Sequence, residues 1–328
     1  MKGSTKDIAE ELARKYGYLT YIIERYLILF GLNETIRLIE ANERKINPVI
    51  RCNTLRTSPH LLYSSLTSKG VKLLKSRWAD YAFEVISSPF SLASTPEYLL
   101  GHFYIHRGPA SLLPPIVLAP TPGDVVIDMT AAPGGKTSHL AQLMENKGTI
   151  IAIDIDRRRI RSLRSNLSRL GVENVIVIRM DARRIYELGI KADKILLDAP
   201  CTGEGLIPLD KSRKMSRTLN DINYCSKLQK ELLEAAIKCL KADGEIVYST
   251  CSIAPEENEF VINSVLEKYP LRIEKIKIDG DPGFTEAFGK KLNDNLRFAK
   301  RLYPHKHGTE GFFICKMILE EDLKNVDQ

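Results

Sequence analysis

The chain has 328 residues, which is more than a single hydrophobic core usually holds, so we expect two domains of unequal size. Its composition is ordinary for a soluble enzyme: no apolar stretch approaches the ~18 residues of a membrane span, and the N-terminus lacks a signal-peptide pattern. Lys and Arg outnumber Asp and Glu by 48 to 41, and residues 1–115 hold 15 of these basic side chains against 10 acidic ones. The N-terminal third is therefore the basic end, either as a polyanion-binding surface or as a solvated face.

The six cysteines exclude two further classes of protein. They show neither the CxxC spacing of a metal site nor the density of a disulfide scaffold. His305 and His307 have no third metal-type ligand spaced with them. We therefore expect no metal, and reduced thiols as in a cytoplasmic protein.

The first 44 residues space their apolar side chains with a helical period, which predicts two or three helices and a break at Gly31. After them the pattern alternates between strand and helix, and predicts a strand at 49–56, a helix at 58–70 and strands at 71–76 and 82–88. This is a small α+β module. The segment 101–124 is rich in proline and glycine and is predicted to be a linker. The expected domains are residues 1–115 and 116–328.

From residue 125 onward, buried apolar strands alternate with helical segments. The pattern predicts parallel βαβ units and a doubly wound, Rossmann-like α/β sheet. Ligands of such sheets bind at the carboxyl ends of the strands. Those ends carry a carboxylate on four strands and a thiol on the fifth: Asp128, Asp154, Asp181, Asp198 and Cys251.

The turn after the first of these strands reads "DMTAAPGGKTSHL". It supplies small residues and a Gly-Gly pair at a helix N-terminus, where a ligand can approach the backbone. It matches neither GxGxxG nor the Walker pattern. Asp154, at the end of the next strand, stands where an acid commonly holds a ribose hydroxyl pair. These features fit an adenosyl cofactor without a pyrophosphate.

Four segments, "DMTAAPGGKTSHLAQLM", "LLDAPCTGEG", "VYSTCSIAPEENE" and "GTEGFFICKM", resemble the motifs of the Nol/Nop/Sun family of RNA cytosine-C5 methyltransferases. The resemblance covers residues 47–317. It implies a class I methyltransferase fold with a smaller N-terminal RNA-binding domain, and S-adenosyl-L-methionine as the methyl donor. By position it implies Asp154 on the ribose, Asp181 near the adenine and Asp198 beside the methyl donor, with the cofactor loop formed by Thr130, Ala131, Ala132, Pro133, Gly134, Gly135 and Lys136.

The resemblance also assigns chemical roles. C5 of cytosine is a weak nucleophile until a group adds covalently at C6, and a thiolate suits that addition. Cys251 of the Thr-Cys-Ser motif is the implied nucleophile, and Cys201 of the Pro-Cys motif is implied to help release the product. Asp198 can accept a hydrogen bond from the cytosine N4 amine or, if protonated, donate one to N3. Lys136 is expected either to contact the base or to hold the cofactor loop.

Other residues have competing interpretations. His106 and Arg107 stand where the family more often has glutamine and an acid, so contacts of that segment with the substrate are left open. Arg51, Asn53 and Arg56 resemble the family's RNA-facing motif. The basic loop of Lys211, Arg213, Lys214 and Arg217 either covers the substrate or is a solvated surface.

We expect a monomer that binds RNA and no membrane. Few residues follow the last predicted strand, so RNA recognition is expected to rest on the N-terminal module. The expected substrate is tRNA, with rRNA as the alternative. A non-catalytic RNA-binding factor of ribosome assembly is the alternative from another class, and the presence of both cysteines and Asp198 argues against it.

Overall fold

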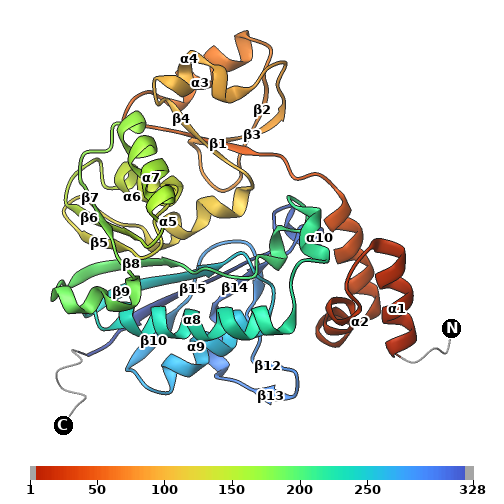
Figure 1. Ribbon diagram of the computed structural model, residues 1–328. Coiled ribbons are helices and arrows are strands. Elements are labelled where there is room, and N and C mark those ends of the chain that lie inside the picture. The colour runs from red at the N-terminus through yellow and green to blue at the C-terminus, as the bar shows by residue number, and fades with distance from the viewer. Residues whose placement is uncertain (1–4, 322–328) are drawn as a thin grey trace.

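The computed structural model describes residues 5–321 and begins with a helical hairpin, formed by α1 (Thr5–Tyr16) and α2 (Thr20–Glu43). Gly31 interrupts α2 with a φ of 72°, as the sequence predicts, because glycine adopts this left-handed conformation without steric cost. The buried face of the hairpin packs against Ile207, Ile253 and Tyr303. The N-terminal hairpin therefore shares a core with the C-terminal half of the chain, and Figure 1 shows it beside α10 (Pro304–His307).

A small antiparallel sheet follows, with the strand order β2-β3-β1-β4. Its strands are β1 (Val49–Cys52), β2 (Lys72–Lys75), β3 (Ala82–Ser87) and β4 (Phe103–His106), with α3 (Pro59–Ser68) between the first two. Ser58 caps α3 by accepting a hydrogen bond from the Leu61 amide at 3.3 Å. The predicted α+β module is confirmed. The division of the chain at residue 115 stays a prediction.

We predicted that residues 101–124 form a linker, and this prediction is wrong in two places. It contains the strand β4 and the helix α5 (Leu113–Leu118), both well packed. Pro114 and Pro115 lie in the first turn of α5, where proline is tolerated because the first amides of a helix have no partner within it. The prolines therefore begin a helix here instead of marking a loop.

The large sheet has the order β11-β14-β15-β9-β8-β5-β6-β7, and β10 also pairs with β15. The five adjacent strands β9, β8, β5, β6 and β7 are parallel to one another, and β15 is antiparallel to β9. Their bounds are β5 (Val125–Asp128), β6 (Thr149–Asp154), β7 (Val175–Arg179), β8 (Ala192–Asp198), β9 (Leu240–Thr250), β10 (Leu271–Glu274), β11 (Asp281–Pro282), β14 (Lys300–Leu302) and β15 (Phe312–Leu319). This is the predicted doubly wound, Rossmann-like α/β sheet.

Helices cover both faces of the large sheet (Figure 1). Successive strand residues point to opposite faces, so Val126 and Val247 pack against α5 and α6 (Gly135–Leu143), with α7 (Arg157–Leu170) beside them. Ile127 and Ile246 pack on the other face, against α8 (Leu219–Ile237) and α9 (Glu259–Leu266). The remaining short elements are α4 (Pro96–Leu99), β12 (Glu286–Ala287), β13 (Lys290–Lys291) and the 3₁₀ helices η1 (Leu92–Ser94), η2 (Pro109–Leu112), η3 (Ala182–Leu188), η4 (Glu204–Leu206), η5 (Lys211–Lys214), η6 (Pro255–Glu257) and η7 (Asp294–Phe298).

Buried polar side chains join the small sheet to the large one. The Arg51 guanidinium donates to Ser138 Oγ at 2.8 Å and to Gln142, both on α6. Asn53 Nδ2 donates to the carbonyls of Gly101 and Leu170 at 2.8 and 2.7 Å. Arg51 and Asn53 are 1% and 2% exposed, so the interpretation of these two residues as RNA-facing is wrong. None of the helices within residues 5–321 has the length and apolar character that a membrane span requires.

Candidate active site

Two thiols meet at the carboxyl ends of neighbouring strands. Asp198 of β8 pairs in parallel register with Ser249 of β9, so the cysteines that follow these strands emerge side by side. The Sγ atoms of Cys201 and Cys251 lie 3.0 Å apart, and neither thiol is in a disulfide. A hydrogen bond to Cys251, together with burial, raises the pKa of Cys201 well above its usual value. Cys201 therefore keeps its proton at neutral pH.

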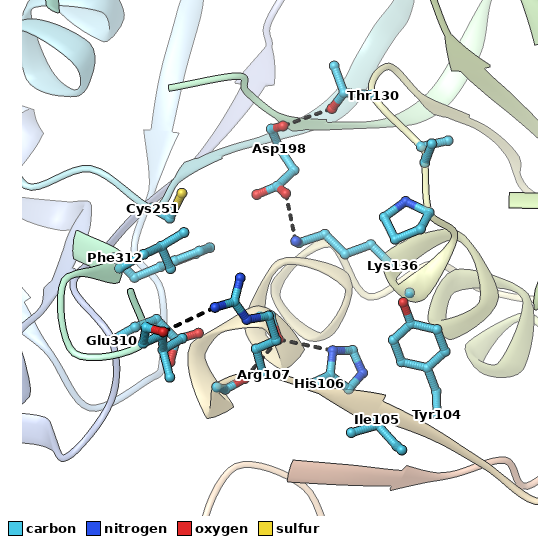
Figure 2. Close-up of a pocket in the computed structure, with 18 of the residues that line it drawn as sticks. Tyr104, Ile105, His106, Arg107, Thr130, Lys136, Asp198, Cys251, Glu310 and Phe312 are labelled. Carbon is cyan, nitrogen blue, oxygen red and sulfur yellow. Dashed lines mark hydrogen bonds and ion pairs between the residues drawn. The ribbon is translucent and has the colours of Figure 1, made fainter. Parts of the chain in front are cut away.

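A carboxylate and an ammonium group lie beside the thiols. Lys136 extends from α6 toward Asp198, as Figure 2 shows, and its Nζ lies 2.6 Å from Asp198 Oδ2. Ser249 Oγ donates to the other carboxylate oxygen at 2.8 Å, and Thr130 Oγ1 donates to the Asp198 carbonyl at 2.8 Å. Burial acts to lower the pKa of Lys136, but the Asp198 carboxylate outweighs it and the pKa is raised. Lys136 is therefore a cation at neutral pH.

The loop that the sequence assigns to the cofactor is Thr130–Lys136, between β5 and α6. Gly134 has a φ of 102°, and a Cβ placed there would lie 2.9 Å from the Leu163 side chain, so only glycine fits without strain. Asp154 is buried at the end of β6, and its carboxylate accepts from the amides of Ala132 and Asp156 at 3.2 and 3.0 Å. These contacts fix the strand-end carboxylate against the loop.

The other two strand-end acids behave differently. Asp128 is buried behind the loop, where Thr137 Oγ1 donates to it at 2.7 Å and burial raises its pKa to about 6. Asp181 is held by Arg183, with Arg183 Nη2 at 2.6 Å from its Oδ2, and this hydrogen bond lowers the pKa of Asp181. Asp181 faces the same cavity as Asp154, whereas Asp128 supports the loop from behind.

Two adjoining cavities share Thr130, Asp198 and Cys251. The first, of about 500 Å³, is lined by these residues together with Lys136, the β4 end and Phe312. In Figure 2, Asp198 and Cys251 lie above Arg107 and His106 around this cavity. The second, of about 450 Å³, is lined by Asp154, Asp181, Cys201 and apolar side chains that include Met129, Met180, Leu228 and Leu232. Asp198 and Cys251 therefore stand where the two cavities meet.

The second cavity fits the adenosyl cofactor that the sequence suggests. Asp154 and Asp181 are acceptor-only groups that match hydroxyl and amine donors, and the methionine and leucine side chains match an aromatic base. The N-terminus of α6, at Gly135, lines the first cavity close to the residues that both cavities share. Within residues 5–321, no group of three or more His, Cys, Asp or Glu side chains is arranged to hold a metal ion.

The basic loop at residues 211–217 forms contacts inside the protein. The guanidinium groups of Arg213 and Arg217 donate to the Thr202 carbonyl at 2.7 and 3.2 Å. Lys214 Nζ donates to the Tyr16 carbonyl at 2.9 Å and pairs with Glu43 at 2.6 Å, and Lys211 donates to the Asn42 carbonyl. These contacts tie the segment after Cys201 to the N-terminal hairpin. Lys214 is buried, so the loop is not a solvated surface throughout, and Arg213 also lines the second cavity. The covering of the substrate by this loop stays a prediction.

Several residues at the site escaped the reasoning from sequence. Phe312 and Glu310 reach the first cavity because β15 runs antiparallel to β9 and returns the "GTEGFF" segment to the thiols. His106 and Arg107, left open above, also line it. Burial lowers the pKa of His106 well below its usual value, so its imidazole is neutral. The segment "GTEGFFICKM" contains Glu310 and was among the family motifs. The position of Glu310 at the site, however, depends on the order of the strands in the sheet, which the sequence does not give.

Comparisons with known proteins identify the family of this chain. The family model described as 16S rRNA methyltransferase RsmB/F matches residues 115–318. A mouse 28S rRNA (cytosine-C(5))-methyltransferase is 40% identical over 94% of this chain, which spans 40% of that relative's length. A tRNA (cytosine(49)-C(5))-methyltransferase of Pyrococcus abyssi is 38% identical over 84% of this chain and 88% of its own. A crystal structure titled NSun6 from Pyrococcus horikoshii with SFG has a TM-score of 0.81 and 32% identity, covering 92% of this chain and 98% of that one.

Proposed function

The chain belongs to the RsmB/F family of RNA methyltransferases, and we propose that it methylates C5 of cytosine in RNA through a covalent adduct between Cys251 and C6 of the base. The observation that carries this proposal is the approach of the two thiols to 3.0 Å beside the Asp198–Lys136 pair. An uncharged dithiol pocket would suit redox chemistry equally well. A cation and a carboxylate within the same site suit a reaction that moves charge across a pyrimidine ring.

Addition to the ring is the first step. The Cys251 thiolate forms the C6–S bond, and the electron pair of the C5=C6 double bond makes C5 nucleophilic as charge develops toward N3 and O2. Lys136 is the cation that can balance that charge, and Asp198 can hold the N4 amine. The ring enters the first cavity, which requires an unstacked cytosine.

S-adenosylmethionine, when bound in the second cavity, supplies the methyl group. Asp154 is the residue to hold its ribose hydroxyls, Asp181 lies toward the adenine end, and Thr130–Lys136 is the loop against its remaining atoms. Asp198 lies on the wall that both cavities share, which supports a position for it between the base and the methyl donor.

Release of the product needs a base. After C5 carries the methyl group, its proton must leave so that the C5=C6 double bond re-forms and the C6–S bond breaks. Cys201 is the group in place to take this proton. Once Cys251 is bound to carbon, the hydrogen bond that holds the Cys201 proton is lost, although Asp198, Glu257 and burial still raise the pKa of Cys201. A thiolate with a raised pKa is a stronger base, which suits this step.

The RNA substrate that we propose is tRNA, with rRNA as the second candidate. The Pyrococcus abyssi relative supports the first and the mouse relative supports the second. A monomeric state is part of the same proposal. So is a cytoplasmic location, because both thiols must stay reduced to react. The non-catalytic assembly factor would keep the fold without turnover.

The experiment that separates these functions is methyl transfer from radiolabelled S-adenosylmethionine to purified tRNA and to rRNA in parallel reactions. The proposal predicts label at C5 of cytosine in one RNA class after nuclease digestion. Bisulfite sequencing of cellular RNA before and after deletion of the gene locates the position. Tight RNA binding with no label in either class would favour the assembly factor instead.

A further inference from the structure

Glu257 is a carboxylate with no exposed surface, and the reaction described above gives it no role beyond raising the pKa of Cys201. It ends η6, six residues after Cys251. Among the described residues no Lys or Arg forms an ion pair with it, and burial raises its pKa despite the hydrogen bonds that it accepts. Burying an acid without a cation is costly, so its contacts must provide the compensation.

The contacts of Glu257 lie on both thiol-bearing segments. Its Oε1 accepts from Thr202 Oγ1 at 2.5 Å and from Ser252 Oγ at 2.7 Å. Its Oε2 accepts from the Thr202 amide at 2.9 Å and from Gln229 Nε2 at 3.1 Å. Thr202 follows Cys201 directly, and Ser252 follows Cys251 directly. One carboxylate oxygen therefore joins the two segments that carry the reactive thiols.

The backbone around Glu257 is fixed as well. Tyr248 Oη, on β9, donates to the Glu257 carbonyl at 2.6 Å. Gln229, on α8, also donates to the Pro200 carbonyl at 2.9 Å, just before Cys201. Only a carboxylate offers two acceptor oxygens with enough lone pairs for four donors, whereas an amide would turn its NH₂ toward at least one of them.

We propose that Glu257 is a positioning residue for the reaction: by holding Thr202 and Ser252 at once, it sets the separation of the Cys201 and Cys251 thiols. This inference rests on the proposed function. A shift of about 1 Å in a reacting group can cost about 100-fold in rate. Loss of the Thr202 contact should therefore impair release by Cys201, and loss of the Ser252 contact should impair addition by Cys251.

Two rates can be measured separately. RNA transcribed with 5-fluorocytidine has no C5 proton to lose after methylation, so the growth of its denaturation-resistant band with S-adenosylmethionine reports addition and methyl transfer without release. Ordinary RNA under single-turnover conditions passes through both steps, and the decay of its band reports release. Thr202→Val should slow release by about tenfold and leave addition within about twofold of wild type. Ser252→Ala should do the reverse.

Glu257→Gln should slow both steps, and Glu267→Gln is its matched control. Within residues 5–321 the exposed Glu267 side chain, just past the end of α9, bonds only Asn263, so the same chemical change there should alter neither rate. Urea unfolding of each variant shows whether it is folded. The two milder variants keep the test decisive if Glu257→Gln is too unstable to assay.

The pH dependence of the release rate shows whether Glu257→Gln acts on the Cys201 thiol or only lowers the stability of the protein. The charged and titratable groups that face the Cys201 thiol are Cys251, Asp198 with its partner Lys136, Glu257, Tyr248, and Arg213 and Arg217 through the Thr202 carbonyl. Removing the negative charge of Glu257 makes the Cys201 thiolate easier to form. The pH at which release reaches half its maximum should therefore move downward in Glu257→Gln and stay unchanged in Glu267→Gln.

The inference is overturned if Thr202→Val and Ser252→Ala change the two rates in the same proportion, or if Glu257→Gln releases product at the wild-type rate with an unshifted pH profile. If the wild-type chain neither methylates RNA nor forms a band with the fluorinated RNA, the proposed function fails first and this inference fails with it.

Discussion

At the scale of single residues, the site depends on the different surroundings of two identical side chains. Cys201 is held protonated by its hydrogen bond to Cys251 and by nearby carboxylates, while Cys251 lies on the wall of both cavities. The identity of these residues could be predicted from the Pro-Cys and Thr-Cys-Ser motifs. Glu257 could not, because "APEENE" has the composition of an exposed loop and becomes buried only when η6 closes onto Thr202.

The first prediction concerns Cys251. Cys251→Ala should lower methyl transfer by several orders of magnitude, because the neighbouring Cys201 keeps its proton and supplies no thiolate for addition at C6. Binding of S-adenosylmethionine, measured by isothermal titration calorimetry, should stay within about twofold of wild type, since the loop at Thr130–Lys136 is unchanged. Undiminished methylation in this variant would contradict the assignment.

The second prediction concerns pH. Because the pKa of Cys201 is raised, its thiolate forms only as the pH rises above the usual thiol value of about 8.5. In single-turnover reactions the rate of adduct release should therefore still increase between about pH 8 and pH 9, with the fraction of ionised thiol. A release rate that reaches its plateau below about pH 7 would rule out a Cys201 thiol of raised pKa as the base.

At the scale of elements, loops and strand ends are held by contacts that a linear pattern does not reveal. The alternation of apolar strands and helices predicts β5 to β9 and their helices, since both faces of a parallel sheet are buried. It does not predict that β4 and α5 lie in a proline-rich segment. Nor does it predict that the basic loop at residues 211–217 bonds to the N-terminal hairpin, because those partners are about 170 to 200 residues away in the chain.

The third prediction tests the cofactor loop. Gly134→Ala forces an L-residue into a left-handed conformation against Leu163, at a cost of about 1–2 kcal/mol or more. Affinity for S-adenosylmethionine should fall about tenfold in calorimetry. Gly289→Ala is the control, because Gly289 has a φ of 72° with nothing within 4 Å of an added Cβ. Gly289→Ala should lose stability without losing affinity for S-adenosylmethionine. Equal affinities in the two variants would contradict a role of the Thr130–Lys136 loop in cofactor binding.

The fourth prediction tests the hairpin. Arg25 of α2 forms a double hydrogen bond to Glu256, at 2.8 and 2.6 Å, just beyond the Cys251 segment. Both side chains are largely buried, so Arg25→Met should lower the free energy of unfolding by about 1–3 kcal/mol. The exposed Arg37–Glu34 pair is the comparison: Arg37→Met should change it by less than about 0.5 kcal/mol in urea unfolding. Equal effects would mean that α2 is not anchored there.

At the scale of the whole molecule, the sequence predicts a basic N-terminal third and a catalytic C-terminal sheet, but not how they fit together. Arg51 and Asn53 join the small sheet to α6 and α7, and the burial of Arg51 removes one cation from the basic surface. The surface available to RNA must come from the remaining cations. Which of them contact RNA depends on three-dimensional placement and not on their count.

The fifth prediction follows from that charge. If the N-terminal third binds the RNA backbone, the logarithm of the binding constant should fall linearly with the logarithm of salt concentration, with a slope of several units. Fluorescence anisotropy of labelled tRNA between about 50 and 200 mM salt measures it. A binding constant that does not change with salt concentration would mean that the basic side chains of the N-terminal third are solvated and do not contact RNA.

The central claim is that two cysteines divide the work of addition and release, and one gel tests it most directly. Cys201→Ala should be incubated with substrate RNA and S-adenosylmethionine and then denatured in detergent with heat, which removes every noncovalent contact but leaves a C–S bond intact. The account predicts a slow-migrating protein–RNA band in Cys201→Ala and none in Cys251→Ala or in the double variant. A band in Cys251→Ala would reverse the two roles, and the absence of a band in every variant, with methylation intact, would contradict the covalent mechanism.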